Sequence, residues 1–203
     1  EIGSSNTSTF SVRNGPFAAG STVRIICING TRWSAHGGDS YFNILNEGEY
    51  IPVSTNGGNS FNSDGITTEI YLNCDIDGYT ADSKMFSAGG AGAPYMIEFG
   101  FLLPYSGAGG GSGIPGGSTQ SVKDSFFPWF PDSDGKDGTF DAGGAGGFTP
   151  NGDPPVNLYG GDGGSSSDGL PAPGGGTGYI ATPGLAGYAF VGSNITVYNN
   201  QPT

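Results

Sequence analysis

The chain has 203 residues, of which 41 are glycine and 14 are proline. An ordinary helical or α/β enzyme is excluded by this glycine content, because each glycine inside a helix costs about 1 kcal/mol relative to alanine. The formal net charge of −12 argues against a nucleic-acid partner, which requires a basic surface, and no apolar run approaches the roughly 18 residues of a membrane span, so we expect no membrane insertion.

Residues 1–86 have the composition of a β-rich domain. Two alternating apolar runs, residues 21–28 and 66–74, predict strands. Turn signals separate such runs, among them Asn56-Gly57-Gly58 and Asp64-Gly65. The chain begins with Glu1 and shows no signal peptide, so we expect a fragment or a processed product.

The chain has two cysteines, Cys27 and Cys74, which are too few for a disulfide scaffold. The alternation within the two strands places both thiols on apolar faces, so two buried thiols and a single disulfide are both open. Thiol catalysis is not expected, because the only histidine, His36, lies in a glycine-rich stretch that we interpret as a turn.

Glycine is concentrated in residues 87–203, which hold 30 of the 41 glycines. One long set recurs at multiples of three: Gly160, Gly163, Gly169, Gly175, Gly178, Gly184 and Gly187. Three residues per turn is the period of the polyproline-II helix, and glycine on one ridge allows neighbouring backbones to bond. We therefore predict a small β-domain followed by a polyglycine-II helix bundle with long connecting loops, a mainly β fold. Disordered linker is the alternative.

Three apolar loops interrupt the glycine clusters. Exposed aromatic side chains on a rigid frame are typical anchors of a recognition surface, although some of these could form a satellite core. The bulky residues of the three loops are the predicted binding residues: Tyr95, Met96, Ile97, Phe99, Phe101, Leu102, Leu103 and Tyr105; Phe126, Phe127, Trp129 and Phe130; and Val156, Leu158 and Tyr159.

Residues 131–138 carry three aspartates, Asp132, Asp134 and Asp137, around a glycine turn. The pattern is a poor match to a calcium loop, because Lys136 stands where an oxygen ligand is needed, and a solvated acidic turn is the favoured interpretation. No catalytic, metal or phosphate-binding motif is present. We expect a protein that is not an enzyme and that has no cofactor and no metal.

The second part resembles the glycine-rich receptor-binding adhesins at the distal tip of T-even-type bacteriophage tail fibres. The resemblance rests on residues 87–95, Ser-Ala-Gly-Gly-Ala-Gly-Ala-Pro-Tyr, on the succession of glycine clusters and dissimilar loops, and on the ending of residues 184–198. It implies that residues 1–86 form an attachment domain for other tail-fibre chains. It also implies that residues 87–203 present receptor-binding loops, with the chain located in the virion at the fibre tip.

The same resemblance implies that the loops bind an outer-membrane protein or a surface glycan of a Gram-negative host. Two other classes were considered. A polyglycine-II ice-binding protein presents flat faces of small residues and lacks long aromatic loops, and a thermal-hysteresis measurement separates it. A capsule-degrading tailspike needs a long parallel β-helix and a carboxylate pair, for which 203 residues of this composition leave little room.

Overall fold

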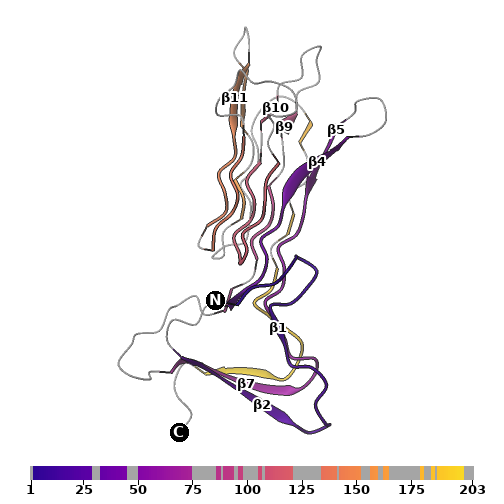
Figure 1. Ribbon diagram of the computed structural model, residues 1–203, viewed down its shortest axis with the longest axis vertical. Helices are drawn as coiled ribbons and strands as arrows, with labels where there is room; N and C mark the ends of the chain where they lie inside the picture. The colour runs from indigo at the N-terminus through magenta and orange to yellow at the C-terminus, as the bar shows by residue number, and fades with distance from the viewer. Residues whose placement is uncertain are drawn as a thin grey trace.

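The computed structural model describes residues 2–28, 33–44, 50–74, 86–87, 89–93, 96–97, 105–106, 108–120, 134–140, 142–151, 156–159, 162–164, 179–180, 184–185 and 187–198. Across these residues every regular element is a β-strand, which confirms the prediction of a mainly β chain. The same residues contain no helix long and apolar enough to cross a membrane. The molecule is elongated, with strands gathered at its two ends and extended chain between them (Figure 1).

The strands are short, and the two longest coincide with the two alternating runs of the sequence. In chain order they are β1 (Val12–Arg13), β2 (Thr22–Ile28), β3 (Trp33–Ser34), β4 (Ser40–Ile44), β5 (Tyr50–Ser54), β6 (Phe61–Asn62), β7 (Thr67–Cys74), β8 (Phe86–Ser87), β9 (Met96–Ile97), β10 (Tyr105–Ser106), β11 (Phe148–Asn151), β12 (Val156–Tyr159), β13 (Tyr179–Ile180), β14 (Phe190–Val191) and β15 (Ile195–Tyr198).

At one end, three stretches of the chain, residues 12–28, 61–74 and 190–198, run side by side in the same direction. We call each of them a pass. Strands β1, β6 and β14 form one sheet in the order β1-β6-β14, and the strands that follow them form a second sheet in the order β15-β7-β2. Each pass therefore contributes one short strand, a turn and one longer strand. The register pairs Phe61 with both Val12 and Phe190 in the first sheet, and Ile70 with both Ile25 and Val197 in the second.

The core of the molecule lies between these two sheets. Cys27, Phe61 and Ile70 are buried there, and Phe61 meets Phe190 edge to face with ring centroids 6.4 Å apart. Half-buried apolar side chains surround the cluster: Val12, Ile25, Trp33, Leu72, Phe190 and Ile195. Cys27 is thus buried on an apolar face, as predicted. The side chain of Cys74 lies outside the described residues.

The middle of the molecule consists of extended segments joined by backbone hydrogen bonds, which we call the glycine lattice. Substitution is sterically restricted there, because a Cβ atom on Gly90, Gly109 or Gly144 would overlap a carbonyl oxygen of another segment. The segments of the lattice are residues 35–39, 55–60, 89–93, 108–117, 135–139, 142–146, 162–164, 184–185 and 187–188.

Within the lattice, the direction of the hydrogen bonds repeats every third residue. The amides of Gly110 and Gly113 donate to the carbonyls of Lys136 and Thr139, whereas those of Gly111 and Ile114 donate to Gly38 and Ala35. Between them, the amide of Ser112 donates to Gly164 of a third segment. Segment 89–93 shows the same three-residue repeat, because the amides of Gly90 and Ala93 both donate to segment 108–117, at the carbonyls of Ser112 and Gly109.

Three segments interpreted as turns run extended through the lattice instead. Gly57 and Gly58 donate to Leu185 and His36, so the signal at residues 56–58 does not form a turn. The stretch around His36 is likewise extended, and its Gly37 amide donates to Pro115. In the acidic segment, residues 135–139 are extended as well. Glycine and asparagine favour turns by local preference, but inter-segment hydrogen bonds satisfy the backbone here.

Segments from both sides of residue 86 share the lattice and the stacked sheets, since residues 35–39 and 55–60 lie among later segments and β14 and β15 pair with β6 and β7. The division of the chain into residues 1–86 and 87–203 stays a prediction. At the end opposite to β2 and β7 lie the β4–β5 hairpin and strands β9, β10 and β11 (Figure 1).

Candidate functional site

Two small sheets lie at the β9–β11 end of the molecule. They contain parts of two of the three predicted loops, the first and the third. Strands β10, β9 and β13 form an antiparallel sheet that pairs Ile97 with both Tyr105 and Tyr179. Strands β11 and β12 form a hairpin that pairs Phe148 with Tyr159, and β10 adjoins both of its strands. The chain segments predicted as the first and third loops are therefore brought together.

The structure places the backbone of six predicted binding residues in these strands: Met96, Ile97, Tyr105, Val156, Leu158 and Tyr159. The other predicted binding residues lie outside the described residues: Tyr95, Phe99, Phe101, Leu102, Leu103, Phe126, Phe127, Trp129 and Phe130. The assignment of these side chains to a recognition surface stays a prediction, because nothing in the described part of the chain tests it.

At this end, sequence reasoning missed strand β13, which pairs with β9, and the β4–β5 hairpin. Its two strands pair antiparallel from Ser40 and Ser54 at the base to Ile44 and Tyr50. The hairpin was hidden within residues 1–86 because its alternation resembles that of the other strands. A usable signal was present: the pairs Gly37-Gly38 and Gly57-Gly58 flank the hairpin, just as glycine clusters flank the loops of the second half.

Side chains near the base of the hairpin hold it to the lattice. Ser40 is buried, and its Oγ lies 2.9 Å from the carbonyl oxygens of Ala93 and Gly109. The Oγ of Ser54 donates to the Ala93 oxygen at 3.0 Å. Directly before the hairpin, the Asp39 carboxylate accepts bonds from both the amide and the hydroxyl of Ser118, at 2.7 and 2.9 Å.

Asp137, one of the three aspartates of the acidic segment, also binds backbone. Its Oδ1 accepts a hydrogen bond from the Thr119 amide at 2.7 Å. Asp132 lies outside the described residues. Among the described residues, no three histidine, cysteine, aspartate or glutamate side chains gather in a way that could hold a metal ion.

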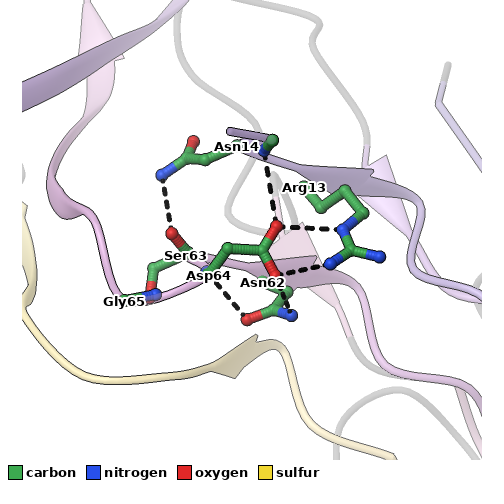
Figure 2. Close-up of polar contacts among 7 residues, drawn as sticks. Arg13, Asn14, Asn62, Ser63, Asp64 and Gly65 are labelled. Atoms are coloured by element: carbon green, nitrogen blue, oxygen red, sulfur yellow. Dashed lines mark hydrogen bonds and ion pairs between the residues drawn. The ribbon is translucent and has the colours of Figure 1, made fainter. Parts of the chain in front are cut away.

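At the end with the stacked sheets, an ion pair joins the first pass to the second (Figure 2). The Nε and Nη2 atoms of Arg13 donate to the two carboxylate oxygens of Asp64 at 2.9 and 2.7 Å. The hydrogen bond from Arg13 lowers the pKa of Asp64 and, reciprocally, raises the pKa of Arg13. An open cleft of about 540 Å³ lies beside the pair, and Phe17 and Ile66 are among the side chains that line it.

The outer face of the second sheet carries a short ladder of side chains. The rings of Tyr71 and Tyr198 stack with centroids 4.7 Å apart, and the Arg24 guanidinium lies over Tyr71 at 5.4 Å. Arg24 also bonds Glu69 at 2.9 Å. Burial, with the nearby Glu69 carboxylate adding to it, raises the pKa of Tyr71. Ile26 and Val197 remain exposed on this sheet.

Few known proteins are similar to this chain. No protein-family model matches the chain, and no curated protein matches it significantly. Among solved structures, the chain is similar to a chain of the crystal structure of the gp37–gp38 adhesin tip complex of the bacteriophage S16 long tail fibre. The TM-score is 0.46 and the sequence identity 18%, over 88% of this chain and 58% of that chain. The chain thus spans a little over half of that chain's length.

Proposed function

We propose that this protein is a receptor-binding adhesin at the tip of a phage tail fibre, and that it acts by binding and not as an enzyme. The observation that carries the proposal is the architecture: a lattice whose buried residues are glycine, alanine and serine, with the strands of two predicted loops at one end and a small packed core at the other (Figure 1). The motifs at residues 87–95 and 184–198, which resemble those of glycine-rich fibre-tip adhesins, favour the same function.

We infer further that the glycine lattice is a bundle of polyglycine-II helices. A helix with three residues per turn points successive amides toward three neighbours and returns to the first at the fourth residue. The hydrogen bonds of residues 110–114 follow that order, which supports the inference. Such a bundle offers no interior pocket, so recognition depends on the elements that leave it.

The bulky residues of the three predicted loops are proposed to bind the receptor, which is an outer-membrane protein or a surface glycan of a Gram-negative host. Rigid positioning supports this role, because a loop whose two ends enter a fixed lattice loses less conformational freedom on binding. The stacked sheets at the opposite end are proposed to attach the chain to other tail-fibre chains, which would place the protein in the virion at the distal tip of the fibre.

The test uses the purified chain and two double variants. Fluorescently labelled protein is screened against a panel of Gram-negative strains, and a strain that it labels saturably is used for the variants. We expect F127S/W129S to lose binding at unchanged thermal stability, because anchors of an interface contribute about 2 kcal/mol or more each. Unchanged labelling by this variant and by F99S/F101S would move the site away from these loops, and absence of labelling on every strain would refute the function.

A further inference from the structure

We propose that the β4–β5 hairpin is an additional receptor-binding element and that it contacts an extracellular loop of an outer-membrane protein. This inference rests on the proposed function, and it adds residues that the sequence had assigned to the attachment end. Its first support is position. The hairpin projects from the lattice at the end where β9, β10 and β11 lie, and away from β2 and β7 (Figure 1).

The hairpin is fixed to the two chain segments that border β9 and β10. Ala93 precedes β9 and Gly109 follows β10, and the buried Ser40 Oγ lies within hydrogen-bonding distance of both of their carbonyl oxygens. Ser54 donates to Ala93 from the other strand of the hairpin. Both arms of the hairpin are therefore fixed to the chain that leads into β9, and Ser40 also holds the chain that follows β10.

One face of the hairpin points away from these anchors. Strand register pairs Tyr41 with Val53 and Asn43 with Ile51, and side chains of such pairs lie on the same face. Exposure on this face increases away from the base: Tyr41 and Val53 are half-buried, whereas Asn43 is exposed and Ile51 is 38% exposed. The opposite face holds the buried Ser40 and Pro52.

The partner contacts this face and not the edge of β5. The amide of Thr55 donates to Asp39, and hydrogen-bonded pairs alternate along an antiparallel ladder, so the Tyr41–Val53 and Asn43–Ile51 pairs exchange the hairpin's own bonds. Pro52 then faces out of the ladder, where it has no N–H to offer to an added strand. Binding energy must come from covering the exposed side chains.

The aliphatic side chains of the face favour a protein partner over a glycan. Tyr41 and Asn43, on the same face, suit either kind of partner. Ile51 and Val53 have neither a π face nor hydrogen-bonding groups for a sugar, and they gain free energy only when apolar surface covers them. Charge points the same way, because the chain carries −12 and the hairpin connection, residues 45–49, contains two glutamates and no basic residue. An anionic polysaccharide would be repelled by this charge, so short-range apolar contact with a protein surface must supply the affinity.

The experiment compares two exposed isoleucines with the same substitution. Ile51→Ser changes the hairpin face, and Ile26→Ser, at a residue 48% exposed on β2 at the opposite end, is the matched control. Labelled chains are titrated onto the strain selected with the parent protein, after thermal unfolding has shown that both variants fold. We expect I51S to bind about tenfold or more weakly, the loss of one interface anchor, and I26S to bind like the parent.

A second arm identifies the partner. Cells shaved with protease are expected to lose labelling, and cells treated with periodate, which destroys glycans, are expected to keep it. Loss after periodate alone would overturn the protein partner. The hairpin's role would be overturned if a folded I51S bound as tightly as the parent, or if I26S and I51S weakened binding equally. In either case F127S/W129S would still test the proposed function separately. A parent chain that labels no strain would overturn both.

Discussion

At the scale of single residues, the turn at residues 62–65 shows why particular side chains are needed. Asp64 has a φ of 51° and Gly65 a φ of 79°, a left-handed conformation that aspartate, asparagine and glycine tolerate best. The Asn62 Oδ1 accepts a bond from the Asp64 amide at 3.0 Å and fixes the turn. The Asp64 carboxylate is then held against Arg13, so one turn links the first pass to the second (Figure 2).

The Arg13–Asp64 pair predicts a pH dependence of stability. The hydrogen bond from Arg13 lowers the folded-state pKa of Asp64 below 3.8, so the stabilisation is present above the unfolded-state pKa and is lost as the pH falls through the folded-state pKa. In D64N, which keeps a residue suited to the left-handed turn, we expect a smaller drop in melting temperature between pH 7 and pH 3. The effect should be modest, because Arg13 is exposed. An identical drop in both proteins would contradict it.

The glycine lattice predicts an unusually large effect of one added carbon atom. Gly110 does not have a left-handed φ, so alanine is compatible with its backbone, but the Cβ would overlap the carbonyl oxygen of Gly117. We expect Gly110→Ala to destabilise the folded chain by about 3 kcal/mol or more, at the upper end of overpacking effects. The control is Ala145→Ser, which adds one atom at an exposed lattice position. Chemical denaturation measures both, and equal stabilities would contradict the steric argument.

At the scale of elements, β6 is the central strand of its sheet although it has only two residues. It pairs with β1 on one side and β14 on the other, which are far apart in the sequence. Its Phe61 is fully buried between the two sheets, packed with Cys27 and Ile70. Within this sheet, the contact between β1, β6 and β14 therefore depends on one side chain more than on strand length.

Truncation of that side chain should test this dependence. Phe61→Ala should cost about 3–5 kcal/mol, the usual range for a large aromatic residue removed from a core. Phe17→Ala is the matched control, because the Phe17 side chain is 51% exposed, and it should change stability by less than about 0.5 kcal/mol. Thermal or denaturant unfolding measures both variants. Comparable losses would mean that the cluster around Phe61 is not the main core.

At the scale of the whole molecule, the net charge of −12 sets how the chain meets a bacterial surface. Long-range repulsion from an anionic surface is screened at physiological ionic strength, where the Debye length is about 8 Å. We expect the affinity for the selected strain to stay the same or to increase between 20 and 150 mM NaCl. A titration of labelled chain at both concentrations is the measurement. If binding weakened more than about tenfold at the higher salt concentration, attraction between opposite charges would be the main contribution to the binding free energy, contrary to this prediction.

The long strands were predictable because their signal is local. Alternation over residues 21–28 and 66–74 identified β2 and β7 to within one residue at the start, and it placed Cys27 on the buried face. The glycine pairs at residues 37–38 and 57–58 were misread, since the same residue types serve tight turns and close backbone approach. Only the neighbouring segments distinguish these two uses.

The position of the candidate site was likewise predictable from the sequence only in part. Sequence marked the apolar segments around residues 95–105 and 156–159, and their strands do lie at one end of the molecule (Figure 1). It did not assign the β4–β5 hairpin to this end, because nothing local indicates at which end of the lattice a hairpin will emerge. The end at which the hairpin emerges depends on how many times the chain has crossed the lattice before it.

Local sequence is enough to specify alternation where one face of a strand is buried and a composition too acidic for nucleic acid. The tertiary structure alone decided which segments are neighbours. Strand β15 pairs with β7 across more than a hundred residues, and residues 35–39 lie against residues 111–117. The physical reason is that backbone hydrogen bonds carry no sequence code, so a glycine segment can bond any other, and the packed core and chain connectivity select the pairing.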